Sequence, residues 1–92
     1  MTERISETTV GELDGVRVGV ANVWERDYVD ADGTPRHGMT ARVAWTEPDG
    51  TERWEVVGVG SRVLLASAAT WSVIRIDKSA GAPGDVVWER VP

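Results

Sequence analysis

The sequence contains no cysteine, no phenylalanine and a single histidine, His37, among its 92 residues. Without cysteine there is no disulfide framework, no cysteine-ligated zinc site, no thiol nucleophile and no iron–sulfur cluster. Basic residues are also scarce, since 10 Lys and Arg face 15 Asp and Glu and leave a net charge of −5. An acidic chain is poorly suited to bind nucleic acid or an anionic membrane without specificity. We therefore expect neither nucleic acid nor a membrane as a partner.

Long hydrophobic runs are missing as well. No apolar stretch approaches the ~18–20 residues that span a bilayer, and residues 1–7 lack the apolar segment of a signal peptide. We expect a cytoplasmic protein with one domain over residues 1–92, because a chain of this length has no room for a second. Nine of the ten basic residues are arginine, which is typical of a GC-rich bacterial genome.

The apolar residues that are present favour strands. Valine is abundant, and β-branched and aromatic residues fall in short runs between Gly, Pro and Asp clusters. The alanines of 61–69 suit a helical turn, but the flanking glycines and the Thr-Trp that follows favour strands. We expect an all-β domain, a single antiparallel sandwich or partly open barrel of six to seven short strands. The predicted strands are 4–10, 16–26, 39–47, 52–59, 62–66, 71–77 and 86–91.

Alternation along the second and third strands predicts which side chains face the core. Side chains two residues apart point the same way on a strand. The first such row contains Val16, Val18 and Val20 and continues to Trp24. The second row contains Met39, Ala41, Val43 and Trp45.

The segment at 47–52, Glu-Pro-Asp-Gly-Thr-Glu, predicts a hairpin, because Pro fixes φ and Gly accepts a positive φ. A loop with an even number of residues places Trp45 opposite Trp54 and Val43 opposite Val56. A three-residue loop places Trp45 opposite Arg53 instead. We expect the even loop because it keeps the apolar row together. A second segment, at 32–36, shares the Asp-Gly-Thr sequence and is expected to form a similar tip.

The last third of the chain does not alternate strictly. Leu64 is apolar where alternation from Val63 and Leu65 predicts a polar residue. Ile74 and Ile76 are likewise apolar where alternation from Trp71 and Val73 predicts polar residues. Such strands are buried on both faces or carry bulges that exchange the faces. A second apolar face also indicates a partner chain, so we expect a homodimer.

No catalytic, cofactor or metal motif stands out, and we expect no cofactor and no metal. His37 is interpreted as a solvated loop histidine. Asp27, Asp30 and Asp32 with Gly33 are interpreted as a turn, because an EF-hand requires Glu where the chain has Gly38. The Gly-x-Gly at 58–60 is interpreted as a tight turn or bulge.

The long turn-rich segment at 27–38 supplies the candidate binding site. Loops on a rigid β-scaffold carry function, and Tyr, Trp and Arg dominate interaction hot spots. We predict a contact patch made of Trp24, Tyr28, Arg36, His37 and Arg42. The other tryptophans are expected in the core, since the chain has no Phe to fill it.

Residues 54–91 carry a pattern of a strand, a Gly-rich turn at 59–63 and a Trp-x-Val-x-x-Ile strand at 71–76. In this pattern the chain resembles a family of small uncharacterised all-β proteins of GC-rich bacteria. Relatives often have Gly-Asp where this chain has Gly60-Ser61. The resemblance implies a compact sandwich or barrel and no assigned activity, and it transfers no functional residue.

Two hypotheses about function follow. The first is a non-enzymatic binding or interaction module, of accessory or immunity type, that engages a protein partner. The second is a cofactor-free binder of a small hydrophobic ligand, or an enzyme of cyclase or isomerase type in secondary metabolism, with a Trp-lined cavity. Catalysis by shape leaves no sequence motif, so enzymatic activity is left open. A nucleic-acid binder is disfavoured by the charge.

Overall fold

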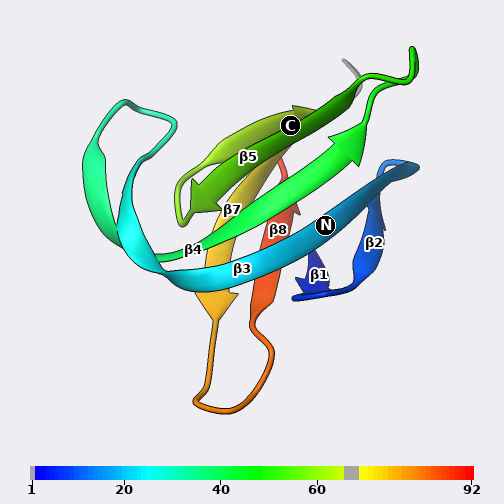
Figure 1. Cartoon of the computed structure of the whole chain (residues 1–92). Coiled ribbons are helices and arrows are strands. Elements are labelled where there is room, and N and C mark those ends of the chain that lie inside the picture. Colours follow the sequence, from blue (N-terminus) through cyan, green and yellow to red (C-terminus); the bar gives the residue numbers. More distant parts are fainter. Residues whose placement is uncertain (1, 66–68) are drawn as a thin grey trace.

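The computed structural model describes residues 2–65 and 69–92, and over these residues the chain forms eight strands and no helix. They form two antiparallel four-stranded sheets, in the orders β1-β8-β7-β6 and β2-β3-β4-β5 (Figure 1). The predicted all-β sandwich or partly open barrel is confirmed. The strands are β1 (Thr2–Ser6), β2 (Val10–Leu13), β3 (Val16–Val29), β4 (Pro35–Thr46), β5 (Glu52–Gly58), β6 (Arg62–Leu65), β7 (Ala69–Asp77) and β8 (Asp85–Arg90).

The chain passes between the two sheets at two corners. One corner joins β1 to β2, and it divides the single strand predicted at 4–10 into two. The other joins β5 to β6 at the Gly-x-Gly, where the Ser61 amide donates to the Gly58 carbonyl at 3.0 Å and Gly60 has a φ of +92°. This confirms the predicted tight turn, because Gly accepts a positive φ without strain. Residue 66, the predicted end of the sixth strand, lies outside the described residues.

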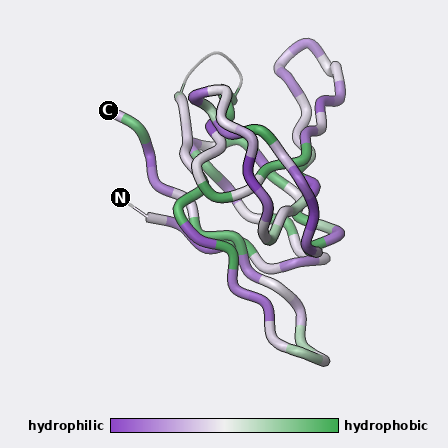
Figure 2. Tube along the Cα trace, turned by 90° about the vertical axis from the view of Figure 1, so that its left-hand side faces the viewer, coloured by the Kyte–Doolittle hydropathy of each residue, from purple (hydrophilic) through white to green (hydrophobic). Residues whose placement is uncertain are grey.

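The core lies between the sheets and consists mainly of valine with three tryptophans. Trp71 and Trp88 are each 1% exposed, and Trp45 is 6% exposed. Figure 2 shows hydrophobic and hydrophilic stretches succeeding one another along the tube. This is the pattern expected of strands with one buried face. No helix in the described ranges is long and apolar enough to cross a membrane.

The register of the β4–β5 hairpin differs from the prediction. Trp45 pairs with Arg53, and Ala44 pairs with Trp54. The Gly50 amide donates to Glu47 and the Glu47 amide donates to Thr51, so Gly50, with a φ of +90°, ends a three-residue loop. This is the turn in which a Gly in the left-handed region follows two turn residues. Trp54 therefore points away from the core, and the predicted Trp45–Trp54 pair is wrong.

The β3–β4 hairpin has the same kind of tip, as its sequence predicted. The Asp30 amide donates to Thr34, the Gly33 amide donates to Asp30, and Gly33 has a φ of +79°. The Asp30 carboxylate accepts from the amides of Asp32 and Thr34, so it caps a turn, as interpreted from the sequence. The strands reach further than expected, and His37 lies within β4 rather than in a loop.

A bulge in β3 places Trp24 on the opposite face from the one predicted. Ala21 pairs with Arg42, but the next pair joins Trp24 to Thr40, so two residues of β3 oppose one residue of β4. Asn22 sits in this bulge with a φ of +52°. The extra residue exchanges the faces, so that Val23 becomes buried and Trp24 exposed. A comparable shift in β7 leaves Ile74 41% exposed and Ile76 buried. Of the two alternatives that the sequence left open for the last third, β7 therefore has the bulge.

Candidate functional site

The face of the β2-β3-β4-β5 sheet that points away from the other sheet is the candidate site. Val18, Val20 and Val43 point into the core, so their neighbours along the strands point outward. The outward residues include an unusual set of large side chains. We call this set the arginine–tryptophan face, and it consists of Arg17, Trp24, Arg26, Arg42 and Trp54.

Both outward tryptophans are paired with an arginine. Trp24 is 54% exposed and Trp54 is 58% exposed, although large aromatic side chains are usually mostly buried. The Arg26 guanidinium carbon lies 4.7 Å from the centre of the Trp24 ring, and that of Arg42 lies 4.5 Å from the centre of the Trp54 ring. These distances are within the range of cation–π attraction, which holds the guanidinium groups in place.

Small residues form the floor between the large ones. Gly19 pairs with Ala44, which in turn pairs with Trp54, and Val10 lies on the far side of Gly19. A hollow of about 450 Å³ lies above this row, lined by residues that include Arg17 and Arg42 as well. A second hollow, of about 240 Å³, adjoins it and is lined by Asn22, Arg26, Arg42, Trp54 and Val56. The face therefore combines an apolar floor with arginines around it, and Glu52 also lines the larger hollow.

The arginines of this face differ from four arginines elsewhere in the molecule. Arg4, Arg36, Arg75 and Arg90 each form an ion pair with an aspartate. In the part of the chain that the structure describes, Arg17, Arg26 and Arg42 form none. The charges of Arg26 and Arg42 are therefore available to an external group, even though the whole molecule is acidic. Arg17 has Glu12 as its cross-strand neighbour.

Tyr28 and Arg36, two residues of the predicted patch, attach the β3–β4 hairpin to the β5–β6 corner. The Tyr28 hydroxyl donates to the Val59 carbonyl at 2.8 Å, and Arg36 donates to the same oxygen at 3.2 Å. The Tyr28 ring covers Gly58, where an added Cβ would lie 2.3 Å from the ring. Figure 1 shows the hairpin curving away from the rest of its sheet. These residues stabilise the fold of the hairpin.

His37, also in the predicted patch, lies between two carboxylates on β3. Its Nδ1 is 2.6 Å from Asp27 and its Nε2 is 2.9 Å from Glu25. These hydrogen bonds, that to Glu25 above all, raise the pKa of His37 above its usual value. Because both ring nitrogens contact carboxylates, this geometry favours the protonated imidazole and suits an ion pair better than a general base.

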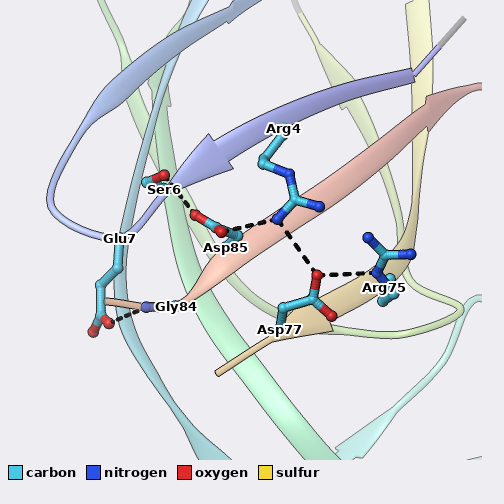
Figure 3. Close-up of polar contacts among 7 residues, drawn as sticks. All are labelled: Arg4, Ser6, Glu7, Arg75, Asp77, Gly84 and Asp85. Carbon is cyan, nitrogen blue, oxygen red and sulfur yellow. Dashed lines mark hydrogen bonds and ion pairs between the residues drawn. The ribbon is translucent and has the colours of Figure 1, made fainter. Parts of the chain in front are cut away.

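A second polar cluster joins β1, β7 and β8 (Figure 3). Arg4 lies 2.8 Å from Asp85 and 3.4 Å from Asp77, and Arg75 lies 3.0 Å from Asp77. The Ser6 hydroxyl donates to Asp85, and with Arg4 it lowers the pKa of that carboxyl. In this cluster the two arginines and the two aspartates form ion pairs with one another. The cluster therefore ties strand ends together and offers no free charge to a ligand.

Glu7 performs a related structural task at the β1–β2 corner. It accepts hydrogen bonds from the backbone amides of Gly84 and Val23 and from Lys78, each at 3.0 Å. These bonds lower its pKa from 4.5 to about 2. The carboxylate thereby links the corner to the bulge in β3 and to the connection between β7 and β8.

Of the five residues predicted as a patch, the structure brings only Trp24 and Arg42 into the arginine–tryptophan face. Tyr28 and Arg36 lie further along the hairpin, and His37 points to the opposite side of the ribbon. The prediction missed Arg26 and Trp54. A Trp-x-Arg sequence on one strand identifies Arg26, since residues two apart share a face. Trp54 was missed because the hairpin register was wrong.

No family model, curated protein or solved structure matches this chain. The resemblance of residues 54–91 to small β-proteins of GC-rich bacteria therefore stays a prediction. Within the described residues, no group of three or more His, Asp or Glu side chains is placed to hold a metal ion.

Proposed function

We propose that the chain is a non-enzymatic interaction module whose arginine–tryptophan face binds a protein partner. The observation that carries the proposal is the pairing of Trp24 and Trp54, both more than half exposed, with arginines on one sheet face. Trp and Arg are the residues most enriched in interaction hot spots. Exposed apolar surface rimmed by polar groups is typical of a protein-binding site.

The placement of the tryptophans favours this proposal over a small-molecule binder with a Trp-lined cavity. Trp71 and Trp88 belong to the packed core, where they touch the buried valines. The hollows that line the arginine–tryptophan face are open and lie on a sheet surface. A shallow surface of this kind suits a protein segment better than a small ligand, which is usually enclosed on most sides. A cytoplasmic location and a homodimer stay predictions from the sequence.

A photo-crosslinking amino acid placed at position 54 tests the proposal in cells that naturally contain the protein. Position 64 is the matched control, because Leu64 and Trp54 are each 58% exposed and belong to different sheets. We expect position 54, but not position 64, to give a discrete adduct with another protein. No adduct, or the same adducts from both positions, contradicts the proposal.

The captured protein must then bind the purified chain through the same face. Trp54→Ala is expected to weaken binding at least about tenfold, the effect of removing a hot-spot side chain. Leu64→Ala is expected to leave the affinity unchanged. Equal affinities of the two variants contradict the assignment of the face.

A further inference from the structure

Two guanidinium groups border a single hollow on the arginine–tryptophan face. Arg26 and Arg42 line it together with Asn22, Trp54 and Val56. Each guanidinium lies over an indole ring. An arginine held against an aromatic face keeps its N–H donors for another partner, and its planar fork matches a carboxylate or phosphate. The hollow is therefore built to receive an oxyanion.

A third guanidinium lies beyond the apolar floor. Outward side chains that are paired across neighbouring strands form a row, and successive rows are two residues apart along each strand. Arg17 belongs to the row before Gly19, Ala44 and Trp54, and Arg42 belongs to the row after it. The apolar row is thus flanked by Arg42 on one side, and on the other by a row in which Arg17 shares the face with Glu12 and Glu52.

We propose that the arginine–tryptophan face binds an acidic, extended segment of the partner protein, in which a carboxylate lies two residues from an apolar side chain. This inference rests on the proposed function. An extended segment lying along the strands presents every second side chain to the face. The pattern that matches the rows is Leu and Glu two residues apart, with Leu over Gly19 and Ala44 and the carboxylate in the hollow lined by Arg26 and Arg42. The sequence Glu-x-Leu-x-Glu presents this pattern in either chain direction.

The charges on the face argue against a second copy of this chain as the occupant. A two-fold interface brings the same patch of both molecules together. The ion-pair-free Arg17, Arg26 and Arg42 of one molecule would then meet those of the other, and like charges placed together disfavour association. A segment with a carboxylate instead supplies the charge opposite to that of Arg26 and Arg42, whose hollow has no carboxylate among its described lining residues.

The test uses two blocked peptides, Glu-Ser-Leu-Ser-Glu and Gln-Ser-Leu-Ser-Gln, and the indole N–H resonances of the full chain. We expect the acidic peptide to shift the resonances of Trp24 and Trp54. The buried Trp71 and Trp88 report that the fold is intact and are expected to stay in place. The neutral peptide is expected to bind at least about tenfold more weakly, since each charged hydrogen bond contributes about a factor of ten.

Matched arginine variants separate the local charge from the overall charge. Arg42→Gln is expected to weaken the acidic peptide about tenfold. Arg62→Gln removes the same charge from an exposed arginine of the other sheet, for which the structure likewise gives no ion pair among the described residues. It is expected to leave the affinity unchanged. Equal losses in the two variants overturn the proposal, because they indicate a nonspecific effect of net charge.

The remaining outcomes distinguish this inference from the proposed function. Equal binding of the two peptides at Trp54 overturns the acidic segment but supports a protein-binding face. If inorganic phosphate shifts the Trp24 and Trp54 resonances as much as the acidic peptide does, the site binds a free anion. If these resonances shift when the protein alone is concentrated, the face binds a second copy of the chain. Either result overturns the inference. Failure of both peptides overturns it as well, and the crosslink at position 54 then decides separately whether the face binds a protein.

Discussion

The two most buried tryptophans, Trp71 and Trp88, differ in whether the indole N–H has a hydrogen-bond acceptor. The Trp71 indole N–H donates to Asp14 at 2.7 Å, and Arg90 donates to the same carboxylate. The Trp88 indole N–H is buried without a protein acceptor among the described residues. Both side chains are 1% exposed, so replacement by Phe removes a similar area from each site. What differs is the hydrogen bond.

We therefore expect Trp71→Phe to destabilise the protein by about 1–3 kcal/mol more than Trp88→Phe, because a charged acceptor loses its buried donor only in the first variant. Urea unfolding of the two variants measures the difference. Equal losses, or a larger loss for Trp88→Phe, contradict this reading of the core.

His37 gives a residue-scale prediction about pH. Its pKa is raised by the carboxylates of Glu25 and Asp27, so its contribution to stability is present below pH 6.5 and is lost as the pH rises through the raised pKa. The NMR titration of the His37 ring is expected to have a midpoint above 6.5, and Glu25→Gln is expected to lower it. A midpoint at or below 6.5 in the parent protein contradicts the geometry.

At the scale of elements, the bulge in β3 decides which side chains reach the arginine–tryptophan face. Its Asn22 adopts a left-handed conformation that Asn and Gly tolerate and β-branched residues avoid. Asn22→Val is expected to destabilise the protein by about 1–3 kcal/mol, the cost of such backbone strain. Asn22→Gly serves as the control and is expected to be close to neutral. Denaturant unfolding measures both, and similar values for the two variants contradict the assigned bulge.

The elements also show what the sequence allows one to predict. Alternation correctly placed Ala41, Val43 and Trp45 in the core, because β4 is regular along that stretch. It failed at Trp24, since a single bulged residue exchanges the faces and leaves no distinct signal in an Asn-Val dipeptide. It failed again at Trp54, because the predicted register was chosen to bring the apolar side chains together and not from the residues of the turn. The Pro-Asp-Gly sequence itself favours the three-residue loop that the structure has.

The candidate site was predictable only in part for the same reason. Trp24 and Arg42 were identified by residue type, and they do lie on one face. Their partners Arg26 and Trp54 depend on strand parity, which the bulge and the hairpin loop determine. Tyr28 and Arg36 were assigned to binding because they adjoin a turn, but tertiary contacts with Gly58 and Val59 engage them in the fold.

At the scale of the whole molecule, Glu7 links the corner between the sheets to two other segments. Its pKa is lowered to about 2, so its stabilising effect is present above pH 4.5 and is lost as the pH falls through about 2. Glu7→Gln is expected to cost about 1–3 kcal/mol at pH 7, the effect of removing a charged hydrogen-bond acceptor. The difference from the parent is expected to shrink as the pH approaches 2.

The matched control is Glu89→Gln, which alters an exposed carboxylate of β8. Thermal unfolding between pH 2 and pH 7 measures all three proteins. A loss at Glu7 that is the same at every pH, or no larger than that at Glu89, contradicts the role assigned to the Glu7 carboxylate.

For the whole molecule, the central proposal is that the exposed Trp24 and Trp54, with Arg26 and Arg42 beside them on one sheet face, bind a partner. Hydroxyl-radical footprinting of the free chain and of its complex with the protein captured at position 54 tests this most directly. We expect Trp24 and Trp54 to be oxidised in the free chain and protected in the complex, while Trp71 and Trp88 stay protected in both. Equal oxidation of Trp24 and Trp54 in the two states would contradict the account.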